Sequence, residues 1–191
     1  MTGVVLCGGQ SLRMGKDKGL HFSRTGRVWA EIMKEKFAYL SIPSVLSINP
    51  LQKKNYRKFF EEKSLAVDNP NINIQGPLLG VLSVHLKYPD QNLMVVACDL
   101  INLDEVVLKK LFSNYNSSQV EAIAFKGERI EPLCAIYSSH GLAKIHEACQ
   151  AGKLRRNSMM HALEELSAAY IPIPEEWKSS FKNFNCTEEF N

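Results

Sequence analysis

A run of five consecutive apolar residues, Leu93-Met94-Val95-Val96-Ala97, most narrowly limits the folds open to this chain. Such a run needs apolar cover on both faces, as in the central strand of a parallel sheet. Short β-branched runs at residues 4–6, 44–48 and 65–67 alternate with longer amphipathic stretches. This alternation predicts an α/β fold in which a doubly wound, mostly parallel sheet lies between two helical layers.

The remaining elements follow from hydrophobic periodicity and turn signals. We expect helices over residues 28–40, 51–63, 77–87, 104–114, 141–150 and 154–167, and further strands over residues 120–125, 133–137 and 169–173. Residues 126–129 read as a turn. With no repeat and no low-complexity tract, residues 1–191 are expected to form a single domain.

Composition excludes several classes of protein. Lys plus Arg is 23 and Asp plus Glu is 20, and a net charge of +3 does not argue for a nucleic-acid or membrane partner. No apolar run approaches the roughly 20 residues of a membrane span. The apolar start is too short for a signal peptide, and the five cysteines form no C-x-x-C pair. We therefore expect a cytoplasmic protein with reduced thiols.

A glycine-rich loop follows the first strand, with the sequence Leu6-Cys7-Gly8-Gly9-Gln10-Ser11-Leu12-Arg13-Met14-Gly15-Lys16-Asp17-Lys18. Consecutive backbone N–H groups in such a loop form a concavity that binds anions. Residues 10–28 hold five basic side chains and one acidic side chain, so the positive charge gathers here. Neither the Walker pattern nor G-x-G-x-x-G is present. The loop is therefore suited to a polyphosphate, without matching either common motif.

Further polar residues stand where other predicted strands end. They are Asn49, Asp68 and Asp99. In open α/β sheets, ligands bind beyond the carboxyl ends of the strands. These residues are therefore candidates for a ligand site, although Asn49 and Asp68 could equally shape turns and Asp99 could cap a helix.

The glycine-rich stretch resembles the signature L-A-G-G-x-S-x-R-M-G-x-D-K of the molybdenum cofactor guanylyltransferases (MobA type), which belong to the Rossmann-like nucleotidyltransferases. It departs at one motif position, where Cys7 replaces Ala. Segments resembling later family motifs follow in order at residues 76–80, 98–99, 131–133 and 183–189. Two further departures are Leu100-Ile101 in place of x-Pro after Asp99, and Cys186-Thr187 in place of Thr-Pro.

The resemblance implies transfer of GMP from GTP to molybdopterin cofactor, with release of pyrophosphate. It assigns catalytic roles to Arg13, Lys18 and Asp99, with Mg²⁺ on Asp99. It assigns nucleotide contacts to Leu6, Cys7, Gly8, Gly9, Lys18, Asn49, Asp68 and Asp99. In this family the double glycine accompanies guanine, so Gly8-Gly9 favours GTP.

Two alternatives to this function stay open. One is a related nucleotidyltransferase that uses CTP or a sugar- or polyol-phosphate acceptor. The other is a non-catalytic nucleotide-binding partner of a molybdoenzyme. For the enzyme, molybdoenzymes or cofactor-biosynthesis proteins are possible partners. Arg155-Arg156 is a candidate for the pterin phosphate, or simply an exposed helix end.

Overall fold

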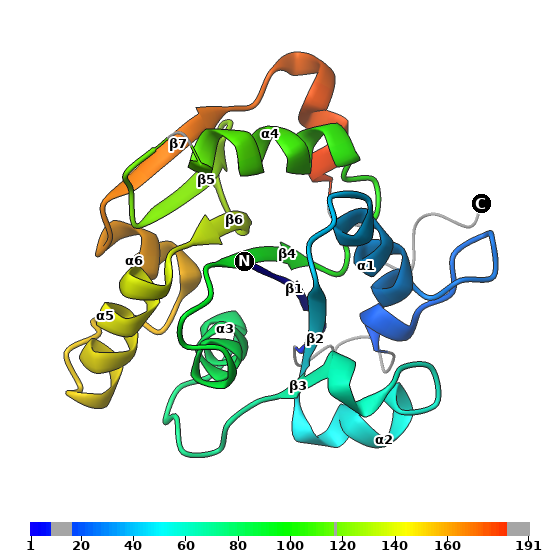
Figure 1. Ribbon diagram of the computed structural model, residues 1–191, viewed down its shortest axis with the longest axis horizontal. Coiled ribbons are helices and arrows are strands. Elements are labelled where there is room, and N and C mark those ends of the chain that lie inside the picture. The colour runs from blue at the N-terminus through cyan, green and yellow to red at the C-terminus, as the bar shows by residue number, and fades with distance from the viewer. Residues whose placement is uncertain (9–16, 117, 183–191) are drawn as a thin grey trace.

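The computed structural model describes residues 1–8, 17–116 and 118–182. Its centre is one seven-stranded sheet in the order β3-β2-β1-β4-β6-β5-β7 (Figure 1). The strands are β1 (Thr2–Leu6), β2 (Ser44–Ile48), β3 (Leu65–Val67), β4 (Leu93–Ala97), β5 (Ala122–Lys126), β6 (Ile130–Tyr137) and β7 (Ala168–Pro172). Every residue of β4 is buried, and β4 lies between β1 and β6. The apolar run therefore forms a central strand, as the sequence predicts.

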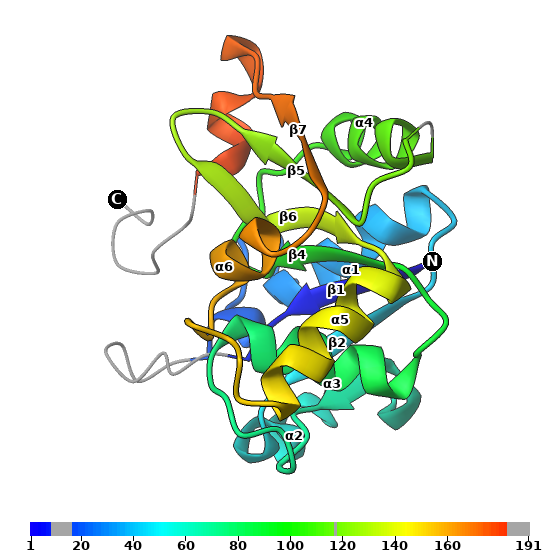
Figure 2. The same ribbon diagram turned by 90° about the vertical axis from the view of Figure 1, so that its left-hand side faces the viewer.

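Helices cover both faces of the sheet. The side chains of α1 (Trp29–Tyr39), α4 (Glu105–Asn116) and the 3-10 helix η5 (Glu175–Phe181) pack into one apolar cluster. Those of α3 (Pro77–Lys87), α5 (Ser139–Gln150) and α6 (Met159–Glu164) pack into a second cluster on the other face (Figure 2). The expected three-layer α/β/α fold is confirmed.

The sheet is parallel except at β6, which runs antiparallel to both β4 and β5. Only three residues connect β5 to β6, and the Gly127 N–H donates to the Arg129 carbonyl at 2.9 Å. A parallel connection needs a crossover of a dozen or more residues, so this short turn forces a hairpin.

The stretch expected as a helix over residues 51–63 is instead broken into short pieces. They are η3 (Pro50–Gln52), α2 (Lys53–Tyr56) and η4 (Glu62–Ser64). Tyr56 is fully buried, but Phe59, one turn further on, is 47% exposed.

The helix expected over residues 154–167 is also shorter, because α6 begins only after Ser158. The Ser158 hydroxyl caps the helix by accepting from the His161 N–H at 3.2 Å. Among the described residues, no helix is both long and apolar enough to cross a bilayer.

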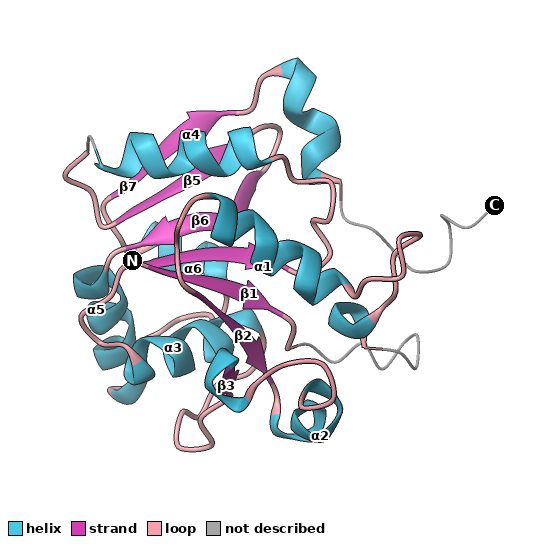
Figure 3. Ribbon diagram, turned by 45° about the vertical axis from the view of Figure 1, so that its right-hand side comes forward, coloured by secondary structure: helices cyan, strands magenta, loops and turns pink. Residues whose placement is uncertain are grey.

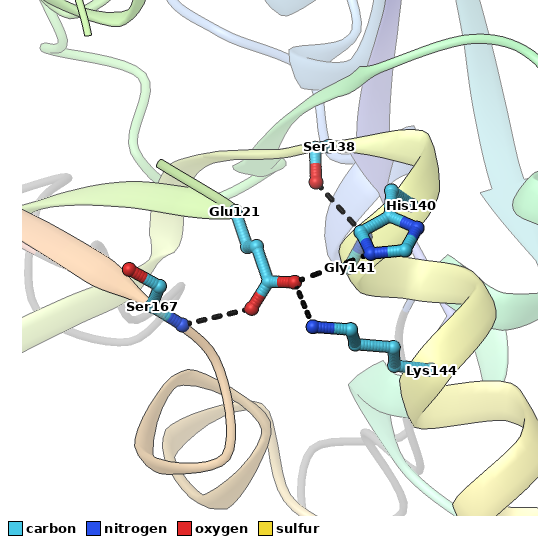
Figure 4. Close-up of polar contacts among 6 residues, drawn as sticks. All are labelled: Glu121, Ser138, His140, Gly141, Lys144 and Ser167. Atoms are coloured by element: carbon cyan, nitrogen blue, oxygen red, sulfur yellow. Dashed lines mark hydrogen bonds and ion pairs between the residues drawn. The ribbon is translucent and has the colours of Figure 1, made fainter. Parts of the chain in front are cut away.

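A polar cluster fastens α5 to the edge of the sheet where β4 begins (Figure 4). The Glu121 carboxylate accepts from Lys144 and, at 3.0 Å, from the Ser167 N–H, while His140 Nε2 lies 3.6 Å from it. The Lys144 ammonium holds the pKa of Glu121 below its usual value. Because Ala122 pairs with Tyr137 and Tyr137 with Leu93, this cluster stands at the opposite end of the sheet from the carboxyl ends of the parallel strands.

Candidate functional site

The carboxyl ends of β1, β2, β3 and β4 meet at one edge of the sheet (Figure 3). The residues that follow these strands are Gly8, Asn49, Asp68 and Asp99. Gly8 lies close to both Asn49 and Asp68. A Cβ placed on it would stand 3.6 Å from the Asn49 nitrogen and 3.7 Å from Asp68 Oδ2. The fold thus brings together residues that sequence position alone identified as candidates.

An ion pair joins Lys18, the last residue of the glycine-rich motif, to Asp99 after β4. The Lys18 ammonium donates to Asp99 Oδ2 at 2.9 Å, although 81 residues separate the two in sequence. Lys18 opens the 3-10 helix η2 (Lys18–Leu20), and Asp99 is the second residue after β4. Both side chains are largely buried, with 24% and 16% exposed. A cation and a carboxylate are therefore held together at the edge where ligands bind in such folds.

Asp17 shapes the turn that carries Lys18. Its Oδ1 accepts from the Gly19 N–H at 3.0 Å and from the Tyr56 hydroxyl at 3.0 Å. Its Oδ2 accepts from Gln52 Nε2 at 2.7 Å. The sequence analysis did not identify the contacts with Tyr56 and Gln52, because these residues lie 39 and 35 positions from Asp17 in the chain.

Asn49 acts as the cap of η3. Its Oδ1 accepts from the backbone N–H groups of Leu51 and Gln52 at 3.0 and 3.1 Å, and Gln52 Oε1 accepts from the Asn49 N–H at 2.8 Å. The turn-forming alternative for Asn49 is thus present in the structure. Because Oδ1 already accepts two hydrogen bonds, the amide nitrogen of Asn49 is the group available to contact a ligand.

A cavity of about 750 Å³ opens beside Gly8. It is lined by Gly8, Asn49, Pro50, Leu51, Asp68, Gln75, Gly76 and Leu79. Both apolar and hydrogen-bonding groups line it, the usual mixture for a small-molecule site. The backbone of Gly76 has φ +79°, a conformation that favours glycine, at the turn into α3.

Asp68 brings a carboxylate to the lining of this cavity. Its Oδ1 is buried and has no hydrogen-bond partner among the described residues. Burial raises the pKa of Asp68 from its ordinary value near 3.8 to about 6. The unpaired, buried Oδ1 costs folding free energy. Oδ2 lies on the Gly8 side of the carboxylate and is the oxygen placed for a ligand contact.

A buried layer beneath the cavity holds Gly80 of α3 against Ser47 of β2. A Cβ on Gly80 would stand 2.4 Å from Ser47 Oγ and 3.6 Å from Asp68 Oδ1. The Ser47 carbonyl accepts from the N–H groups of both Cys7 and Gly8, at 2.9 and 3.0 Å. Leu6 and Cys7 are buried, so the end of β1 forms a fixed wall of the site.

The donor set near Asp99 fits a hard cation. Mg²⁺ is typically held by one or two carboxylates together with phosphate oxygens of the substrate and water. In the part of the chain that the structure describes, no group of three or more His, Cys, Asp or Glu side chains could hold a metal ion. The single carboxylate of Asp99 is therefore suited to Mg²⁺ bound with a phosphate substrate, and unlike the four-ligand set of structural zinc.

Some residues assigned from the sequence lie outside the part of the chain that the structure describes, and one assignment is corrected by it. Gly9 and Arg13 lie outside the described residues, as does the motif-like segment 183–189. Arg155 and Arg156 are exposed in the connection between α5 and α6. They belong to no helix, so the helix-end interpretation of this pair is wrong.

The mostly parallel seven-stranded sheet with helices on both faces is consistent with a Rossmann-like nucleotidyltransferase fold. A family model described as the MobA-like NTP transferase domain matches residues 3–166. The chain therefore belongs to this family, and the family and enzyme class expected from the sequence are confirmed.

Individual relatives agree with this family. A Geobacillus protein described as a probable molybdenum cofactor guanylyltransferase is 27% identical over 194 residues, covering 100% of this chain and 96% of that protein. The solved structure of molybdopterin-guanine dinucleotide biosynthesis protein A from Archaeoglobus fulgidus superposes with a TM-score of 0.78 at 22% identity, covering 97% of this chain and 92% of that one. A 4-diphosphocytidyl-2C-methyl-D-erythritol synthase from Anaerococcus prevotii gives 0.69 at 10% identity, covering 96% and 89%. At these identities the two structures show a shared fold.

Proposed function

We propose that this protein transfers GMP from GTP to molybdopterin cofactor, in a reaction that requires Mg²⁺ and releases pyrophosphate. The observation that carries the proposal is that the Lys18–Asp99 ion pair and a cavity lined by the Asp68 carboxylate lie at the same end of the sheet. Family membership and the name of the Geobacillus relative support the choice of substrates.

The cavity favours guanine through Asp68. The hydrogen-bonding edge of guanine carries two neighbouring N–H donors, at N1 and N2, and an ionised carboxylate is an acceptor only. The corresponding edge of cytosine has one donor beside two acceptors, which a carboxylate would repel. Above pH 6 the Asp68 carboxyl is mostly ionised and therefore suited to guanine.

The phosphates of GTP lie on the basic side of the site in this proposal. The terminal phosphate of the pterin attacks the α-phosphorus of GTP, a new P–O bond forms, and the bond to pyrophosphate breaks. Such transfers depend on positioning and on neutralising charge. Lys18 and Arg13 neutralise the departing pyrophosphate, and Asp99 would hold Mg²⁺, which neutralises phosphate charge when bound.

The Lys18–Asp99 ion pair prepares both groups for this task. Each charge balances the other while the nucleotide is absent, so two largely buried ions are not left uncompensated. With GTP and Mg²⁺ bound, Lys18 would pair with the phosphates and Asp99 would hold the cation. Leu6, Cys7, Gly8, Gly9 and Asn49 complete the nucleotide contacts.

Pyrophosphate release distinguishes this function from its alternatives. The protein is incubated with Mg²⁺, either GTP or CTP, and either molybdopterin or a panel of sugar and polyol phosphates. We expect release with GTP plus molybdopterin. Release only with CTP or with a sugar phosphate would overturn the assignment, and the absence of release from every pair would favour a non-catalytic nucleotide-binding protein.

A further inference from the structure

We infer that Tyr56 and Gln52 are positioning residues, which set the place of Lys18 by holding the carboxylate of Asp17. The inference rests on the proposed function for the identity of the nucleotide. Neither residue belongs to the glycine-rich motif, and both come from the short η3–α2 segment after β2. Their side chains nevertheless reach the residue immediately before Lys18.

Gln52 uses all its hydrogen-bonding groups at the junction of three segments. Its Nε2 donates to the Cys7 carbonyl at 2.9 Å and to Asp17 Oδ2 at 2.7 Å. Its Oε1 accepts from the Asn49 N–H at 2.8 Å. The end of β1, the end of β2 and the start of η2 are thereby tied to one side chain.

Tyr56 reaches the same carboxylate from the core. Its ring is fully buried and stacks on Phe60 with centroids 5.9 Å apart. Its hydroxyl donates to Asp17 Oδ1 at 3.0 Å. Gly19 makes this approach possible, because a Cβ at that position would stand 2.1 Å from the hydroxyl oxygen. Burial raises the pKa of Tyr56, so the hydroxyl keeps its proton and remains a donor.

These contacts act on Lys18 through the backbone. Asp17 is the cap of η2, and three donors hold its carboxylate: Tyr56, Gln52 and the Gly19 N–H. The negative charge of Asp17 is thereby satisfied by protein groups, and Lys18 is fixed where its ammonium meets Asp99. Misplacing a reacting group by about 1 Å can cost roughly 100-fold in rate, so a fixed Lys18 matters for phosphate transfer.

Tyr56→Phe tests the inference, because it keeps the buried ring and removes one hydroxyl. Tyr137→Phe is the matched control, since Tyr137 is also fully buried and its hydroxyl donates to one acceptor, the Pro132 carbonyl, at 2.8 Å. Dissociation constants for GTP with Mg²⁺ and for guanosine are measured by calorimetry on wild type and both variants. Thermal unfolding is followed in parallel.

We expect Tyr56→Phe to weaken GTP binding by about tenfold, the loss of about one charge-assisted hydrogen bond, and to change guanosine binding by less than about twofold. The preference for the triphosphate over the nucleoside should therefore fall. Tyr137→Phe should leave the dissociation constants for GTP and guanosine unchanged, even if it lowers the melting temperature as much as Tyr56→Phe does. Gln52→Met should lower the preference further, because it removes three hydrogen bonds at once.

An unchanged triphosphate preference in Tyr56→Phe, or an equal loss of affinity for GTP and guanosine, would overturn the inference. The same titrations with CTP and cytidine separate this outcome from a failure of the proposed function. If wild type binds CTP and cytidine more tightly than GTP and guanosine, the guanine assignment is wrong. The positioning role is then judged by the CTP-over-cytidine preference of the same variants.

Discussion

Replacing Asp68 by Asn should stabilise the protein and weaken its binding of GTP. The carboxyl is partly buried with no partner for Oδ1, and its pKa is raised to about 6 in the folded protein. A raised pKa means that the folded state holds the proton more tightly than the unfolded state. Wild-type stability therefore falls as pH rises from about 4 to about 6, and stays lowered above that range. Asparagine does not ionise and avoids this loss.

The size of the effect follows from the pKa shift. Two pKa units correspond to about 2.7 kcal/mol, and solvent screening of this partly open carboxyl reduces the figure to about 1 kcal/mol. For a chain of this length, about 1 kcal/mol raises the melting temperature by roughly 2–4 °C. Loss of a charged acceptor for the guanine N–H groups costs about 1.5 kcal/mol, which is roughly tenfold in the dissociation constant for GTP.

Two measurements check this prediction. Thermal unfolding of wild type and Asp68→Asn is followed at pH 4 and at pH 7.5. At pH 4 the two proteins should have equal melting temperatures, and at pH 7.5 the variant should melt at the higher temperature. Calorimetric titration at pH 7.5 gives the affinities for GTP. A variant no more stable than wild type at pH 7.5, and with unchanged GTP affinity, would refute the role of Asp68 as a buried, ligand-facing carboxylate.

Three other substitutions and one treatment give clear expectations. Asp99→Ala should abolish pyrophosphate release while circular dichroism stays native, and undiminished turnover would count against the metal assignment. Gly80→Ala should destabilise the fold by about 1–3 kcal/mol, seen in denaturant melts, because the new Cβ would stand 2.4 Å from Ser47 Oγ. Cys7→Ala, which restores the family's usual residue, should change GTP affinity by less than about twofold, since its backbone contacts are kept. Chelation with EDTA should stop turnover, and added Mg²⁺ should restore it.

Strand position could be predicted from the sequence where burial dictates it. The β4 run is apolar throughout because helices cover both faces of the sheet there. The end of this run in the sequence therefore predicts that Asp99 lies at the carboxyl end of a central strand. Asn49 and Asp68 were candidates because they follow predicted strands directly, and the structure places both in the lining of one cavity. The family resemblance came from the glycine-rich motif and the order of the later motifs, and the family model confirms the family.

Other features depend on contacts that periodicity does not record. Gln52 lies in a stretch expected as a surface helix, yet it joins Cys7, Asn49 and Asp17. The reversal of β6 follows from a connection too short for a crossover, a signal that strand patterns alone do not weigh. The roles assigned to individual site residues, and a single domain over residues 1–191, stay predictions.

The most direct test of the account is a crystal structure of the protein with Mg²⁺ and a non-hydrolysable GTP analogue. We expect the guanine in the cavity with its N1 and N2 groups donating to Asp68, the triphosphate against Lys18, and the cation on Asp99. A nucleotide bound elsewhere, or a base that does not contact Asp68 while the phosphates lie away from Lys18, would contradict the proposed site.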